Sequence, residues 1–237
     1  CPPPPPPPPI LVVNMIPPDQ SGETTQDSQP ALAVLPTNSQ KMVGFTNNTL
    51  PKITSGFTTA PMFYSTDGGR NWAQSGTVIE FNGSRTRDVA LSFGGANRLY
   101  AAAMSGTSNF LDFYRFASVP PTQPSILGVR TSGNLPFALA RPNGTVDQVY
   151  FAYSDASFGL APLVDRTVNG TVSNPVWSTF RLSSRSGCFS GLPAVSLTRH
   201  ADGTMYGIYY FRRLLNNSCP AGEVLPVDVV VVRDDNG

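Results

Sequence analysis

The chain has 237 residues and a formal net charge of +1, and 40% of its residues are hydrophobic, so it can bury the core of one large domain or two smaller ones. Only 13% of the residues are charged, and the basic ones are not clustered as they are on a nucleic-acid-binding surface. The sequence contains no apolar run of about 18 residues, the length that predicts a transmembrane helix.

The chain begins with Cys1 rather than Met, so we expect a processed chain or part of a longer one. Eight consecutive prolines follow. Because proline has a fixed φ and no N–H to donate, residues 1–9 are expected to form a polyproline II rod or linker about 25 Å long. This block resembles the proline-rich segments of hydroxyproline-rich cell-wall and matrix glycoproteins. The resemblance implies hydroxylated or O-glycosylated prolines, which would be Pro2, Pro3, Pro4, Pro5, Pro6, Pro7, Pro8 and Pro9.

Residues 10–15 form a β-branched apolar run that ends before Pro17 and Pro18, and this run predicts a buried strand. From residue 29 onward, one unit recurs four times: an apolar strand, a polar turn and a second strand rich in aromatic residues or alanine. The turns are centred near residues 38, 95, 143 and 202, at spacings of 57, 48 and 59 residues. An all-β pattern with such a period is typical of propeller blades with four strands.

The second half of each unit predicts a third and a fourth strand. In the first unit these strands flank residues 65–72, where Asp67-Gly68-Gly69 is strong turn chemistry and Trp72 follows as an apolar anchor. The third unit places Trp177 where the first has Trp72. We expect no helix of normal length, because Gly and Pro interrupt every long window.

Residues 65–72 also fit the pattern S-x-D-x-G-x-x-W, the Asp box of the sialidase-like β-propellers. The chain ends at residues 233–237, where Asp235 and Gly237 align with Asp67 and Gly69 of that motif. The resemblance implies structural turns at Ser65, Asp67, Gly69, Trp72, Asp235 and Gly237. We therefore predict an all-β propeller of four-stranded antiparallel blades over residues 10–237, about four of them, ending within an Asp-box turn. Two β-sandwich domains are the alternative.

The catalytic residues of the sialidase-like enzymes do not map onto this sequence. Those enzymes bind a carboxylate with three arginines, and Met15 stands where the first arginine would be; a thioether cannot make that salt bridge. The three glutamates, Glu23, Glu80 and Glu223, do not fall in strands that would point to a propeller centre. The sequence therefore predicts no catalytic residue of the sialidase type and a chain that is not an enzyme.

Other kinds of site receive little support from the sequence. His200 is the only histidine and precedes a turn, and the three cysteines lack zinc-site spacing, so we predict no metal and no cofactor. Asp234 and Asp235 are interpreted as turn residues. A pair of carboxylates for glycoside hydrolysis stays open among twelve aspartates.

Five N-x-S/T sequons favour a secreted glycoprotein of the cell surface or the extracellular matrix; they begin at Asn47, Asn82, Asn143, Asn169 and Asn216. In such a compartment Cys188 and Cys219 are expected to pair as a disulfide, with two buried thiols as the alternative. Cys1 would then be left for a partner.

Two functions are compatible with these patterns. The first is a non-enzymatic structural or adhesive module that associates with itself or with other extracellular glycoproteins, as in a fibre. The alternative is a glycan-binding or glycan-hydrolysing propeller. An incomplete last blade would expose an unpaired sheet edge, so we expect the chain to self-associate.

Overall fold

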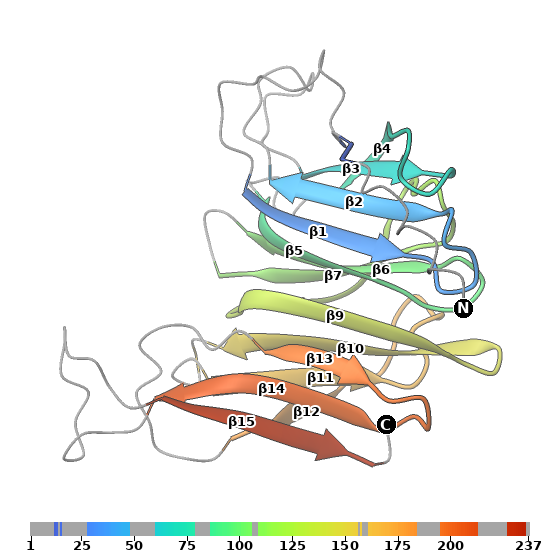
Figure 1. Ribbon diagram of the computed structural model, residues 1–237. Helices are drawn as coiled ribbons and strands as arrows, with labels where there is room; N and C mark the ends of the chain where they lie inside the picture. The colour runs from blue at the N-terminus through green and yellow to red at the C-terminus, as the bar shows by residue number, and fades with distance from the viewer. Residues whose placement is uncertain are drawn as a thin grey trace, which may run out of the picture.

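The computed structural model describes residues 12–13, 15, 28–47, 60–78, 86–105, 109–155, 157, 161–183, 195–212 and 227–235. Fifteen strands form four antiparallel sheets, and the described residues contain no α-helix. Figure 1 shows the sheets following one another in chain order, from the first at the top of the view to the last at the bottom. The structure confirms the predicted all-β propeller of four-stranded antiparallel blades.

Each sheet takes its strands in sequence order, as a meander. The first contains β1 (Ser28–Val34), β2 (Met42–Asn47), β3 (Ala60–Ser65) and β4 (Ala73–Val78). The second contains β5 (Thr86–Phe93), β6 (Leu99–Ser105), β7 (Leu111–Phe116) and β8 (Ser125–Arg130). The third contains β9 (Asn134–Asn143), β10 (Val146–Asp155), β11 (Ala161–Thr167) and β12 (Ser178–Arg181). The fourth contains β13 (Ser196–Arg199), β14 (Met205–Arg212) and β15 (Val227–Asp234).

The first strands of the sheets lie side by side, β1 against β5, β5 against β9 and β9 against β13, as the inner strands of a propeller do (Figure 1). Three apolar clusters fill the spaces between successive sheets. Strand β6 is buried at every position, because a neighbouring sheet covers each of its faces. Strand β15 alternates between exposed and half-buried positions, because only one of its faces is covered.

One predicted strand is wrong. Val12, Val13 and Met15, the described residues of the run 10–15, do not lie in a strand. The side chain of Met15 instead occupies the space that a Cβ on Gly44 of β2 would need, next to Trp72. Because Gly44 offers no side chain of its own, the surface of the first sheet has a hollow there that a thioether fills.

Candidate functional site

A cavity of about 500 Å³ lies between the third and fourth sheets, within the size range of small-molecule sites. The apolar part of its lining, called the apolar floor below, consists of Val164, Leu182, Leu197, Met205, Gly207 and Val232. Three aromatic side chains, Tyr150, Phe180 and Tyr206, and four charged ones, Arg166, Arg233, Asp234 and Asp235, complete the lining. An apolar floor with a few polar groups can hold the faces of a sugar ring and its hydroxyl groups.

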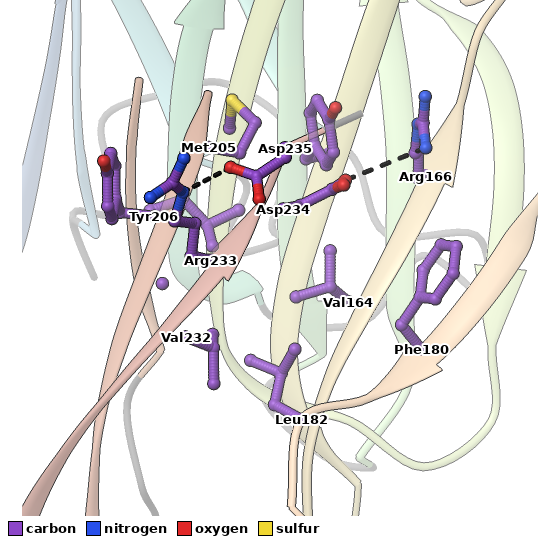
Figure 2. Close-up of a pocket in the computed structure, with 13 residues that line it drawn as sticks. Val164, Arg166, Phe180, Leu182, Met205, Tyr206, Val232, Arg233, Asp234 and Asp235 are labelled. Carbon is purple, nitrogen blue, oxygen red and sulfur yellow. Dashed lines mark hydrogen bonds and ion pairs between the residues drawn. The ribbon is translucent and has the colours of Figure 1, made fainter. Parts of the chain in front are cut away.

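The charged residues come from two facing strands. Arg166 is near the end of β11, and Asp234 closes β15; Arg166 Nη1 lies 3.7 Å from Asp234 Oδ2 (Figure 2). Arg233 Nε contacts Asp235 Oδ1 at the exposed side of the cavity (Figure 2). Both carboxylates therefore sit beside a guanidinium at the cavity wall.

Tyr150 of β10 is the buried polar residue of the wall. The residue is only 4% exposed, and its hydroxyl has no hydrogen-bond partner among the described residues. The Arg166 guanidinium lies over its ring, 5.9 Å from the centroid. Burial raises the pKa of Tyr150, while the charges of Arg166, Arg141 and Arg199 act in the opposite direction. The neutral phenol is thus a hydrogen-bond donor inside a positively charged surrounding.

Four of the predicted turn residues, Ser65, Asp67, Gly69 and Trp72, lie on the first sheet, away from this cavity, whereas Asp235 lines the cavity. Asp67 Oδ1 accepts the backbone N–H groups of Arg70 and Asn71, both at 3.0 Å, and the Ser65 hydroxyl at 2.8 Å. Gly69 N donates to Ser65 Oγ at 2.9 Å, and Trp72 Nε1 donates to the Gly69 carbonyl at 3.0 Å. Gly68 and Gly69 have φ values of 77° and 86°, which an L side chain rarely adopts. These contacts describe a structural turn.

The other predicted positions are dispersed. Asn143 is exposed at the β9–β10 hairpin, Asn169 lies in the loop after β11, and Asn47 ends β2. His200 is an exposed turn residue 3.0 Å from Asp202 Oδ1. Pro2–Pro9, Asn82, Asn216, Gly237 and all three cysteines, Cys1, Cys188 and Cys219, lie outside the described residues, so the rod and the disulfide stay predictions.

The sequence analysis missed Tyr150 and Arg166. A signal was present in the repeat itself, because the second unit has Tyr100 and Arg115 at the corresponding places of its second and third strands. Among the described residues, no group of three or more His, Cys, Asp or Glu side chains is placed to hold a metal ion. The described part of the chain also has no helix long and apolar enough to cross a membrane.

No protein-family model matches the chain, and no curated protein matches it. Solved structures with a similar fold include the GH93 α-L-arabinofuranosidase of Fusarium graminearum with arabinobiose, at 13% identity and a TM-score of 0.59 over 89% of this chain. A mutant of that enzyme with an iminosugar inhibitor aligns over 88% of this chain, at 13% identity and a TM-score of 0.57. The chain spans 63% and 62% of the length of these two structures.

These neighbours correct two predictions. The chain was expected to be a non-enzymatic structural module, and no catalytic activity was expected. The solved structures that share its fold include α-L-arabinofuranosidases, which are enzymes, and this finding contradicts both expectations. The reasoning failed because Met15 in place of an arginine excludes one arrangement of residues, and not a site assembled elsewhere on the same fold.

Proposed function

We propose that this chain is a carbohydrate-active propeller that binds a glycan in the cavity between the third and fourth sheets and hydrolyses a glycosidic bond there. The main support for this proposal is the cavity of about 500 Å³, whose lining combines an apolar floor, three aromatic rings, arginines and two carboxylates. The likeness of the fold to arabinofuranosidases supports this choice of ligand over other small molecules.

The chemistry expected of the site follows from glycoside hydrolysis in general. That reaction uses two carboxyl groups around an oxocarbenium-like transition state, one of which donates a proton to the leaving oxygen. Asp234 and Asp235 are the carboxylates that line the cavity, and we assign Asp234 as the group that faces the sugar. Tyr206 and Phe180, on opposite sides of the cavity, supply aromatic surface for a sugar ring (Figure 2).

We further propose that the propeller is of the sialidase-like type, with an Asp-box turn in its first sheet. The hydrogen bonds within residues 65–72 support an Asp-box turn. We also propose a secreted glycoprotein, for which the exposed sequon at Asn143 offers an accessible acceptor. The proline block would then be an extracellular spacer.

Turnover of aryl glycosides tests the proposed activity, with α-L-arabinofuranosides as the first member of the panel. We expect hydrolysis that Asp234→Asn lowers at least about 100-fold, the lower range for a group in acid–base catalysis. Asp202→Asn, in an exposed turn of the same sheet, is the matched control and should leave the rate unchanged. Binding on a glycan array without turnover of any glycoside would reduce the proposal to a lectin. The absence of both binding and turnover would refute it.

A further inference from the structure

The space between the second and third sheets shows how this fold satisfies a buried tyrosine. Tyr100 of β6 donates its hydroxyl to Asp147 Oδ2 at 2.7 Å. The same carboxylate accepts Arg98 Nε at 2.5 Å and the backbone N–H of Gly95 at 2.7 Å. Asp147 is fully buried and comes from β10 of the following sheet. A carboxylate therefore fills the pocket between these two sheets and neutralises an arginine there.

Tyr150 of the third sheet occupies the position that Tyr100 occupies in the second sheet. Tyr100 pairs with Arg115 in the β6–β7 register, and Tyr150 pairs with Arg166 in the β10–β11 register. Tyr100 packs in the cluster between the second and third sheets, and Tyr150 packs in the cluster between the third and fourth. Each tyrosine thus faces the sheet that follows its own.

The fourth sheet presents other residues to Tyr150. Its second strand, β14, contributes Met205 and Gly207 to the cavity wall, and neither side chain carries a charge. The second strand of the third sheet, β10, instead contributes Asp147 to the hydroxyl of Tyr100. Among the described residues, the Tyr150 hydroxyl therefore lacks the acceptor that the Tyr100 hydroxyl has.

This difference leaves the Tyr150 hydroxyl without the carboxylate that the Tyr100 hydroxyl has between the second and third sheets. Within the described part of the chain the Tyr150 hydroxyl has no hydrogen-bond partner, an uncommon state for a buried polar group that points to binding of a ligand. Arg166, Arg141 and Arg199 act electrostatically on Tyr150, against the single carboxylate of Asp234. The surroundings of the hydroxyl thus favour an anion.

We propose that the cavity takes the carboxylate of an acidic sugar, a uronic acid, at the Tyr150 hydroxyl, as the fold holds Asp147 at the Tyr100 hydroxyl between the second and third sheets. The carboxylate accepts a hydrogen bond from Tyr150 and pairs with Arg166, while the sugar ring lies on the apolar floor. This inference rests on the proposed function and narrows its substrate class to glycans that contain uronic acids.

Isothermal titration of the intact chain with galacturonate, glucuronate, galactose and inorganic sulfate tests the assignment. We expect at least one uronate to bind at least about tenfold more tightly than galactose. Tyr150→Phe should weaken that uronate about tenfold, as expected for the loss of one hydrogen bond to a charged group, and leave galactose unchanged. Tyr100→Phe is the matched control, because its hydroxyl serves the internal carboxylate, and it should retain uronate binding.

Met205→Asp gives a second and independent readout. The new carboxylate should accept a hydrogen bond from the Tyr150 hydroxyl. The variant should therefore lose uronate binding and melt at a higher temperature than the parent chain. Equal binding of galactose and both uronates would overturn the inference and leave the proposed function standing. Sulfate that binds as tightly as the uronates would also overturn it, because the site would then recognise an anion without a sugar. Turnover of neutral glycosides without any uronate binding would overturn the inference alone.

Discussion

The Asp67 carboxylate organises the turn between β3 and β4 through several hydrogen bonds at once. The backbone N–H of Asn71, the Asn71 side chain and the Ser65 hydroxyl lower its pKa from 3.8 to about 2. At the tip of the β13–β14 hairpin, hydrogen bonds from Thr204 lower the pKa of Asp202 to about 2 in the same way. Both turns are thus held by a carboxylate in its charged form.

A pH dependence of stability follows from the lowered pKa of Asp67. Because the folded pKa lies below the ordinary value, the carboxylate stabilises the fold above pH 3.8, and this contribution disappears as the pH falls toward about 2. We expect Asp67→Asn to lower the melting temperature at pH 6 and to melt with the parent chain near pH 2. Thermal unfolding followed by circular dichroism between these pH values measures the difference. A gap between the two chains that does not change with pH would contradict the assignment.

The residue scale also shows where sequence reasoning stopped. Asp67, Gly69 and Trp72 are close in sequence, so their spacing alone predicted a turn whose hydrogen bonds the structure describes. Tyr150, Arg166 and Asp234 come from three strands of two sheets, and their proximity depends on how those sheets pack. Sequence patterns predict how the two strands of a hairpin pair, but they do not predict which residues of two packed sheets face one another. The cavity was therefore not predictable from a single sequence.

At the scale of elements, Trp72 and Trp177 occupy matching positions in the first and third sheets but make different contacts. Trp177, just before β12, lies with its ring centroid 5.5 Å from those of Phe113 and Phe151, and it donates Nε1 to the Leu127 carbonyl of β8. It thus joins the third sheet to the second. Trp72 donates Nε1 to Gly69 within its own turn and lies over the surface of the first sheet.

We expect Trp177→Ala to destabilise the fold by about 3–5 kcal/mol, the cost of removing a large ring from an aromatic cluster. Trp72→Ala is the matched comparison and should cost clearly less, because Trp72 is only half-buried and its ring lies against Gly44 and Gly69 of the first sheet. Urea unfolding at constant m-value measures both changes. Equal losses for the two variants would mean that Trp72 also joins two sheets.

Strand identity was the most predictable property of the elements. Alternating or fully apolar runs around Gly, Asn and Asp turns located the four hairpins that begin the sheets, and the structure contains them as β1–β2, β5–β6, β9–β10 and β13–β14. The apolar run 10–15 carried the same signal, yet its described residues are not in a strand. Its composition fits a strand, but composition does not determine whether a sheet edge is available to pair with it.

At the scale of the whole molecule, the row of sheets leaves an apolar face uncovered on the last one. Ile208, Tyr210, Val227, Val229 and Val231 project from β14 and β15 and are between 44% and 61% exposed. Leu32 and Val34 of β1, on the first sheet, are 60% and 41% exposed. Between the first and last sheets, every pair of facing surfaces packs through an apolar cluster.

The described part of the fourth sheet has three strands, with β15 at its edge. An edge strand offers unpaired N–H and C=O groups, and here it lies beside a contiguous apolar face. Both features favour pairing with another chain.

We therefore predict that the chain self-associates at tens of micromolar through the exposed face of β14 and β15. A Val229→Lys, Val231→Lys double variant places two charges on that face, where desolvating them would oppose association, and it should sediment as a monomer. Val176→Lys is the matched control, because Val176 is 87% exposed but lies outside this face, and it should associate as the parent chain does. Analytical ultracentrifugation over a concentration series distinguishes the three chains. A parent chain that stays a folded monomer throughout the series would show that the exposed face does not mediate association.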